Sequence, residues 1–175
     1  MNIVVITSSP RKKGNSNLLA EEFCRGAEGH NLFRFDAAHK KVAPCLACEK
    51  CGCKDPCVQQ DDFRELREPL IAADMVVFAA PVYYFGMCAQ MKAVMDRFYS
   101  VNAHLRGKGK KAALLLTLAD SSAGTYAPSV AQYKAMISYL GWEDAGQIIA
   151  TGVWSKGDAA KTDFPAQAHA LGKSL

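Results

Sequence analysis

The sequence predicts an α/β fold of three layers, in which a five-stranded parallel sheet carries helices on both faces. Five short apolar runs alternate with longer amphipathic runs, the pattern of strands joined by helical crossovers. Three of the five runs lack the polar-apolar alternation of a half-exposed strand, as expected for strands buried on both faces. Right-handed crossovers then place helices on each side of the sheet.

Each element follows from its own pattern along the chain. The expected strands are residues 2–6, 31–36, 75–80, 112–118 and 145–151. Apolar side chains at helical spacing predict helices in residues 15–29, 60–73, 90–101 and 127–141, and in the tail beyond Gly152. Asn15 or Ser16 is the expected N-cap of the first helix. The spacing of Asp62 and Glu65 fits a capping box at the second.

Length and composition indicate one globular domain over residues 1–175. A chain of this size can bury about 70% of its unfolded surface, and 50% apolar with 22% charged residues is a globular composition. The net charge of +4 comes from scattered basic residues, which argues against a nucleic-acid groove. No basic leader precedes the first apolar run, and no run exceeds the length of a strand. We therefore expect a soluble, cytoplasmic protein without a membrane span.

The loop after the first strand has the composition of an anion-binding site. It reads TSSPRKKGNSN, from Thr7 to Asn17, and it leads from a strand into a helix. Hydroxyl and backbone N–H donors therefore converge on a helix N-terminus, whose dipole favours negative charge, and Arg11 can close over the site. The loop lacks the glycine patterns of Walker A and dinucleotide sites, so a monophosphate is the better fit. The alternative is a solvated polar turn with a good helix cap.

Two further loops at strand ends suit a planar ring. APVYYFGM, Ala80 to Met87, places three consecutive aromatic residues at the end of the third strand, where a ring can stack and bond to loop amides. Alternatively, these aromatic side chains fold onto the core or fill an oligomer contact. The small polar loop from Leu118 to Tyr126 suits the edge of a ring, and Asp120 is either a carboxylate at that site or a helix cap.

In order and spacing, SSPRKKGNSN, PVYYFGM and QMKAVMDRFYS resemble the NADPH-dependent FMN reductase family, and most closely its iron-sulfur flavoprotein branch. The resemblance covers roughly the first 125 residues. It implies a flavodoxin-like sheet of order 2-1-3-4-5 with FMN at its carboxyl edge. By position, the phosphate would be held by Ser8, Ser9, Arg11, Asn15, Ser16 and Asn17. The isoalloxazine ring would be held by Pro81, Val82, Tyr83, Tyr84, Phe85, Gly86 and Met87, together with Asp120, Ser121 and Ser122. The family resemblance also implies a homodimer or homotetramer.

The resemblance implies an FMN-dependent oxidoreductase that takes hydride from NAD(P)H and passes electrons to a small acceptor such as a quinone or free flavin. Such chemistry needs no protein nucleophile, because the cofactor carries it. The sequence accordingly contains no G-x-S-x-G elbow and no H-x-x-x-H pair. An alternative is an iron-sulfur flavoprotein that carries electrons between redox proteins through FMN and a 4Fe-4S cluster. A second alternative is a scaffold that kept the fold without the flavin.

A cysteine-rich loop, residues 43–60, follows the second strand and contains five of the seven cysteines. The connection between the second strand and the next helix is longer than most loops in compact domains. Its spacing resembles the C-x2-C-x2-C opening of ferredoxins and matches the iron-sulfur flavoprotein motif. The expected ligands of a 4Fe-4S cluster are Cys45, Cys48, Cys51 and Cys57. Cys53 is an alternative fourth ligand, and structural zinc or free thiols remain open.

Overall fold

Five parallel strands form the middle layer of the protein in a computed structural model that describes residues 1–54 and 56–175. Residue 55, inside the cysteine-rich loop, lies outside the described residues. The sheet order is β2-β1-β3-β5-β6. A short sixth strand, β4, pairs antiparallel with β3 as a hairpin that the sequence did not predict. The strands are β1 (Asn2–Thr7), β2 (Asn31–Asp36), β3 (Met75–Tyr83), β4 (Gly86–Met87), β5 (Lys111–Thr117) and β6 (Glu143–Ala150).

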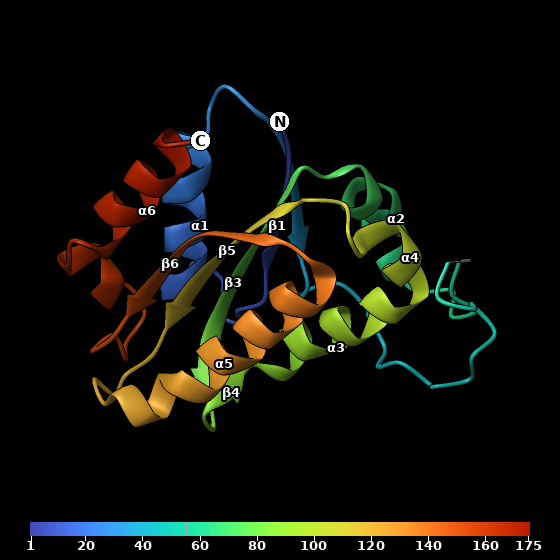
Figure 1. The fold of residues 1–175 in the computed structure, drawn as a ribbon. Coiled ribbons are helices and arrows are strands. Elements are labelled where there is room, and N and C mark those ends of the chain that lie inside the picture. Colours follow the sequence, from blue (N-terminus) through green and yellow to red (C-terminus); the bar gives the residue numbers. More distant parts are fainter. Residues whose placement is uncertain (55) are drawn as a thin grey trace.

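Helices cover both faces of this sheet (Figure 1). One face carries α1 (Asn15–Gly26), the short 3-10 helix η2 (Asp158–Lys161) and α6 (Phe164–Lys173). The other carries α2 (Phe63–Ala72), α3 (Ala89–Arg97), the 3-10 helix η1 (Phe98–Val101), α4 (Asn102–Leu105) and α5 (Ala123–Leu140). Counted among the parallel strands alone, the order is 2-1-3-4-5, so the predicted flavodoxin-like architecture is confirmed.

The three central strands, β1, β3 and β5, are buried on both faces, which explains their continuous apolar sequence. In β1, Ile3 and Val5 face a core shared with Phe23 of α1. Val4 and Ile6 face the opposite core, which α2, α3 and α5 complete. A strand between two cores has no solvent face on which polar residues would be favoured. The same arrangement recurs in β3 and β5.

Helices α1 and α6 pack closely because a glycine lies on each side of their contact. A Cβ atom at Gly26 would lie 2.0 Å from the carbonyl oxygen of His169, and one at Gly172 would lie 2.2 Å from that of Phe23. Side chains cannot fit at such separations, so both positions require glycine. This contact fixes α1, whose N-terminus follows the predicted phosphate loop.

The predicted N-cap of α1 and the predicted capping box of α2 are wrong, although Asp62 does occupy the N-cap position of α2. The N-cap of α1 is Gly14, not Asn15 or Ser16, because the side chain of Asn15 is engaged elsewhere. At α2 the Asp62 carboxylate accepts the backbone N–H of Lys41 at 2.7 Å, and Glu65 forms an ion pair with a neighbouring lysine. The predicted capping box therefore does not form, since both carboxylates bind the chain that precedes the cysteine-rich loop.

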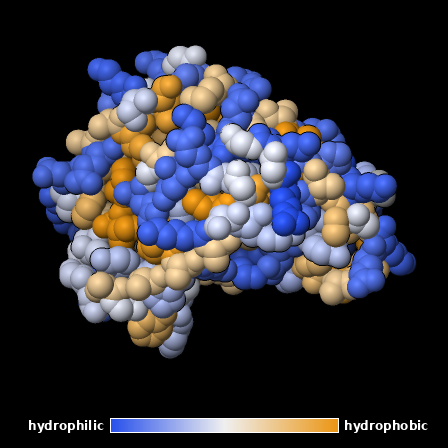
Figure 2. Space-filling model, viewed as in Figure 1, coloured by the Kyte–Doolittle hydropathy of each residue, from blue (hydrophilic) through white to orange (hydrophobic). Residues whose placement is uncertain are grey.

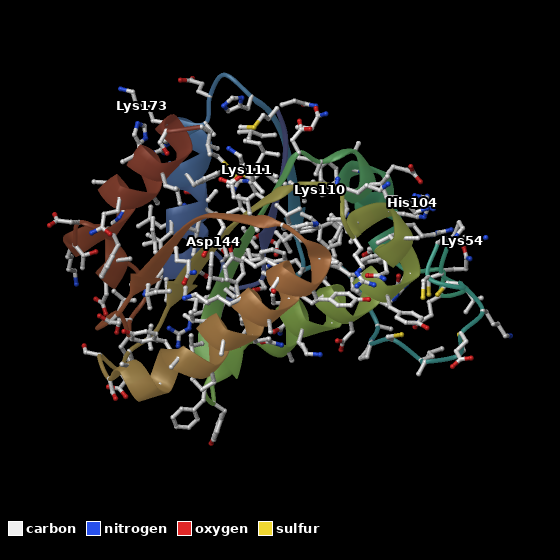
Figure 3. The ribbon with its side chains drawn as sticks, viewed as in Figure 1. Lys54, His104, Lys110, Lys111, Asp144 and Lys173 are labelled. Atoms are coloured by element: carbon white, nitrogen blue, oxygen red, sulfur yellow. The ribbon has the colours of Figure 1, made fainter. Side chains whose placement is uncertain are left out.

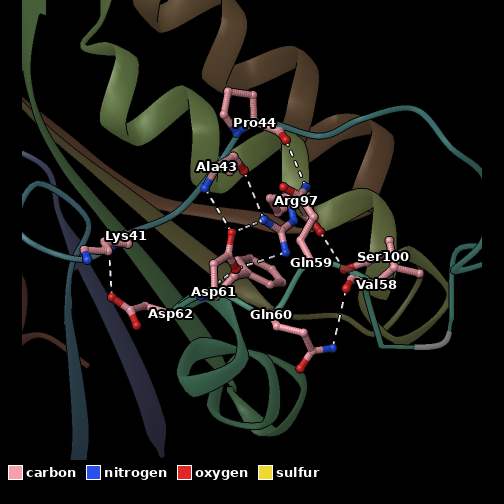
Figure 4. Close-up of polar contacts among 11 residues, drawn as sticks. Lys41, Ala43, Pro44, Val58, Gln59, Gln60, Asp61, Asp62, Arg97 and Ser100 are labelled. Atoms are coloured by element: carbon pink, nitrogen blue, oxygen red, sulfur yellow. Dashed lines mark hydrogen bonds and ion pairs between the residues drawn. The ribbon is translucent and has the colours of Figure 1, made fainter.

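A buried ion pair between Arg97 and Asp61 fastens the cysteine-rich loop to α3 (Figure 4). Arg97 is only 1% exposed. Its guanidinium donates to the two carboxylate oxygens of Asp61 at 2.6 and 3.2 Å, and to the carbonyl of Ala43 at 3.0 Å. The N–H of Ala43 in turn donates to Asp61 at 3.0 Å. Both ends of the loop are thereby held at one point.

The charge of Asp61 is stabilised by this arrangement. Burial acts to raise the pKa of the Asp61 carboxyl, but hydrogen bonds from Arg97 and from the N–H groups of Ala43 and Phe63 outweigh it and hold the pKa below its usual value. The ring of Phe63 also lies 4.9 Å from the guanidinium carbon of Arg97, within cation–π range.

No helix in residues 1–54 and 56–175 combines the length and apolar character needed to cross a bilayer.

Replacing Arg97 with methionine is expected to lower the free energy of unfolding by about 1–3 kcal/mol at pH 7, because it leaves the partly buried Asp61 carboxylate without its guanidinium donors. Urea unfolding measures the loss. A folded-state pKa below the unfolded value of about 3.9 stabilises the protein above that pH, and the contribution is lost as pH falls through the folded pKa. The difference between Arg97→Met and wild type should therefore shrink in acid.

Lys92→Met is the matched control, because Lys92 pairs with Asp96 on the exposed face of the same helix. Exposed pairs contribute about 0–1 kcal/mol. An equal loss in both variants would contradict a special role for the buried pair.

Candidate functional site

The ends of four strands border one open groove with a volume of about 200 Å³. It lies where the carboxyl ends of β1, β3, β5 and β6 meet, the usual ligand position in such sheets. Its lining residues are Ser9, Arg11, Asn15, Pro81, Val82, Tyr83, Thr117, Leu118, Ala119, Val153 and Trp154. Three loops that the sequence singled out therefore come together, joined by a fourth, after β6, that it did not.

The predicted phosphate loop holds a free hydroxyl at the start of α1. Ser16 Oγ is fully buried and has no hydrogen-bond partner among the described residues. Ser9 is also buried, and its oxygen accepts the N–H of Arg11 at 3.3 Å. A Cβ atom at Gly14 would lie 2.5 Å from Ser9 Oγ and 3.0 Å from the carbonyl oxygen of Arg11. The loop is therefore tight, and a hydroxyl donor inside it has no protein acceptor.

The side chain of Ser8, which the motif predicts to bind phosphate, hydrogen-bonds within the protein. Its hydroxyl donates to the Ala79 carbonyl of β3 at 3.1 Å. The buried thiol of Cys88 donates to Ser8 Oγ at 3.1 Å. The side chain of Ser8 therefore anchors the loop to the sheet. Cys88 is buried, as predicted for a packing residue.

Asn15 and Arg11 bind the segment after β6. The Asn15 amide donates to the Ser155 carbonyl at 2.9 Å, and its oxygen accepts the N–H groups of Gly157 and Ala159 at 3.1 and 3.3 Å. Arg11 Nη1 donates to the carbonyl of Trp154 at 2.9 Å. Sequence reasoning missed this wall of the groove. The sequence did contain a signal for it, because Trp154 follows the last strand. An aromatic residue at the end of a strand was also the signal that singled out the loop after β3.

The aromatic run forms the tip of the β3–β4 hairpin. Tyr83 pairs with Gly86, which leaves Tyr84 and Phe85 as a two-residue turn with φ values of 48° and 65°. Positive φ at both positions is typical of tight hairpin turns but costs energy for bulky residues. Tyr84 is 100% exposed and Phe85 is 56% exposed. Figure 2 shows this tip projecting beyond the body of the protein.

Asp120 does not line the groove, and its carboxylate forms hydrogen bonds within its own loop and to the adjoining helix. Its carboxylate accepts hydrogen bonds from the Thr125 hydroxyl and, at 2.9 Å, from the Ser122 N–H. These bonds hold the pKa of Asp120 below its usual value. They tie the loop after β5 to the first turn of α5, whose N-cap is Ser122 and not Asp120.

The four predicted cluster ligands line one cavity in the cysteine-rich loop. Cys45, Cys48, Cys51 and Cys57 all border a small cavity of about 20 Å³, whereas Cys53 does not. The Ala47 N–H points to Cys45 Sγ at 3.4 Å. Over the described residues, no three side chains of His, Cys, Asp or Glu are grouped as a single metal ion requires. The arrangement is thus a ring of thiols around a cavity.

The far side of this loop is fixed to α4. Ala103 donates to the Cys53 carbonyl at 2.9 Å, and His104 lies beside Lys54, with its ring nitrogen 3.1 Å from the Lys54 carbonyl (Figure 3). The thiol of Cys53 hydrogen-bonds to Tyr99 and raises the pKa of that phenol to about 12. Tyr99 lines the cavity, whereas Cys53 does not.

Comparison with known proteins identifies the family. A family model described as NADPH-dependent FMN reductase matches residues 1–152. The chain belongs to the NADPH-dependent FMN reductase family. This confirms the predicted family.

Several relatives of this FMN reductase family member are iron-sulfur flavoproteins. One from Archaeoglobus fulgidus is 37% identical over 112 residues, covering 62% of this chain and 51% of the relative. One from Methanosarcina thermophila is 40% identical over 104 residues, covering 55% and 52%. The chain thus spans about half the length of these relatives. The structure of an NAD(P)H:quinone oxidoreductase from Methanothermobacter marburgensis superposes with a TM-score of 0.75 at 17% identity, covering 99% and 94%, and shows the shared fold.

The residues present fit FMN. The free Ser16 hydroxyl at a helix N-terminus suits a phosphate oxygen, since an unpaired buried donor is otherwise costly. Pro81, Val82 and Tyr83 give the same groove an apolar and aromatic side for a ring. Ser9, Arg11, Ser16 and this hairpin are thus the groups that could hold the cofactor of an FMN reductase. The remaining predicted ligands stay predictions.

Gly14→Ala is expected to weaken FMN binding about tenfold, because the added methyl group displaces Ser9 or the Arg11 carbonyl from the phosphate loop. Titration of apoprotein with FMN, followed by flavin fluorescence, gives the dissociation constant. Gly29→Ala is the control, since a Cβ atom there meets nothing within 4 Å. Unchanged FMN affinity in a folded Gly14→Ala protein would show that phosphate does not bind in this loop.

Proposed function

We propose that this protein is an FMN-dependent oxidoreductase that takes hydride from NAD(P)H and passes the electrons to a small acceptor such as a quinone or free flavin. The observation that carries the proposal is the groove itself. It joins the tight loop before α1, which lines it with Ser9 and Arg11, to the aromatic hairpin at the end of β3, which lines it with Tyr83. One end suits a phosphate and the other a planar ring, which are the two ends of FMN.

FMN supplies the hydride acceptor and electron donor when it is bound. The role of the chain is to bind and orient it. Ser16 and the N-terminus of α1 would bind the phosphate, and Arg11 has donors to spare beyond the one it gives Trp154. The walls from β3 and β5 would hold the ring, while the open side of the groove admits the substrates.

The activity is tested with protein that has been reconstituted with FMN and freed of excess flavin. NADH and NADPH oxidation is followed with a quinone, free FMN and ferricyanide as acceptors. We expect acceptor-dependent turnover that is lost in the apoprotein and restored by FMN. No NAD(P)H oxidation with any acceptor by protein shown to contain FMN would exclude the proposed function.

A second candidate function is electron transfer between redox proteins through FMN and a 4Fe-4S cluster. The observation that favours it is the common cavity of Cys45, Cys48, Cys51 and Cys57, with an N–H directed at one sulfur. Cysteine thiolates are the ligands of such clusters, and N–H groups near the sulfurs tune them. The relatives named iron-sulfur flavoproteins agree with this assignment. The homodimer or homotetramer stays a prediction in either function.

Cys57→Ser is expected to abolish most iron binding, whereas Cys53→Ser should retain it, because Cys57 lines the cavity and Cys53 does not. Iron, zinc and acid-labile sulfide are measured after anaerobic reconstitution of each variant and of wild type. Cluster loss in Cys53→Ser but not in Cys57→Ser would make Cys53 the fourth ligand. Wild-type protein that takes up zinc, or no metal, would refute the cluster.

A further inference from the structure

We propose that Trp154 determines which electron acceptors the protein uses, by stacking its indole on the ring of a planar acceptor such as a quinone. This inference rests on the proposed oxidoreductase function. It concerns the wall of the groove formed by the segment after β6, which the sequence patterns did not reveal.

Trp154 offers a large aromatic surface at the groove. It lines the groove together with Pro81, Tyr83 and Thr117, and it is 72% exposed. The residue before it, Val153, is buried, and the Val153 N–H donates to the Leu118 carbonyl at 3.0 Å. The backbone is therefore anchored to the end of β5 while the indole remains free to contact a ligand.

The segment is held rigidly on both sides of the indole. Asn15 binds the Ser155 carbonyl and, with its oxygen, the N–H groups of Gly157 and Ala159. Arg11 holds the carbonyl of Trp154 itself. A preorganised aromatic wall loses little conformational entropy when a ligand stacks on it, so the stacking contributes more fully to binding. A surface tryptophan without a ligand would not need four such bonds around it.

The position of Trp154 relative to the family match distinguishes the acceptor from the cofactor. The family model covers residues 1–152 and ends two residues before Trp154. Groups that bind what all members share, FMN and NADPH, should lie inside the matched region. A groove residue outside it is suited to the ligand that differs between members, and the acceptor is that ligand.

The chemistry defines the acceptor class. NAD(P)H delivers a hydride, which is two electrons and one proton, and a second proton comes from solvent. A quinone takes up the two electrons and both protons, becomes a hydroquinone, and leaves NAD(P)+ as the other product. Quinones and hydroquinones are planar six-membered rings, which can stack on an indole. Ferricyanide, an octahedral anion that takes one electron, has no ring to stack.

The test compares menadione with ferricyanide in Trp154→Ala. We expect kcat/KM for menadione to fall roughly 3–10-fold, chiefly through KM, with kcat/KM for ferricyanide within about twofold of wild type. Trp154→Phe should recover most of the menadione activity because it keeps a ring. Tyr139→Ala, which removes an exposed aromatic side chain outside the groove, should leave both acceptors unchanged.

The outcomes separate the two proposals. Wild-type protein that contains FMN but turns over neither acceptor refutes the proposed function. Active wild type with an unchanged Trp154→Ala variant overturns only the role of Trp154. Equal losses with both acceptors, or a higher KM for NADPH, also overturn it. Weaker FMN binding with an unchanged KM for menadione would assign the indole to the cofactor and likewise overturn the inference.

Discussion

The bidentate pair between Arg97 and Asp61 is the constraint on which the cysteine-rich loop depends. No helix or strand lies in residues 43–54 or 56–60 of this loop, so its ends must be fixed by side chains. A guanidinium that is 1% exposed tolerates burial only with its partners in place, because an unpaired buried charge is strongly unfavourable. The pair therefore fixes the positions of Ala43 and Asp61 relative to each other. These two residues mark the ends of the segment that carries the thiols. Arg97 also borders the cavity of those thiols, so the anchor and the candidate ligands belong to one unit.

Helix α3 connects this unit to the groove. At its N-cap, Cys88 donates to Ser8 of the phosphate loop, and its last residue is Arg97. Nine helical residues rise about 13 Å, so one rigid element fixes the separation between the two candidate sites. A flavin in the groove and a cluster in the cavity would thus be held by opposite ends of the same helix. Displacement of either end of α3 would therefore alter the geometry of both sites. Two sites joined only by loops would not be coupled in this way.

Sequence reasoning predicted the sheet because each strand carries its own signal, a short apolar run without alternation, as in β1 and β3. It singled out three of the loops that line the groove for the same local reason. It failed where a side chain acts across the fold. Asn15 looks like a helix cap, yet it binds the segment after β6, which is near only because Gly26 and Gly172 let α6 approach α1. Asp62 and Glu65 have the spacing of a capping box, but they bind Lys41 and Lys40. The choice between Cys53 and Cys57 depends on loop conformation, including the positive φ of 66° at Cys53, and spacing does not determine it.

The two aromatic walls of the groove are positioned by different physical means. On one side, Tyr83 lines the groove next to a hairpin turn that holds Tyr84 and Phe85, outside the groove, at positive φ. This conformation costs each about 1–3 kcal/mol and persists only where the flanking structure enforces it. Pairing of Tyr83 with Gly86, and the Ser129 hydroxyl bonded to the Phe85 carbonyl at 3.3 Å, provide that enforcement. The opposite wall needs no backbone strain at Trp154, because hydrogen bonds from Asn15 and Arg11 fix the chain around it. A strained hairpin is intolerant of change, whereas a hydrogen-bonded segment accepts a new side chain at its exposed position. Acceptor preference can therefore vary at residue 154 without disturbing the part of the groove suited to the flavin.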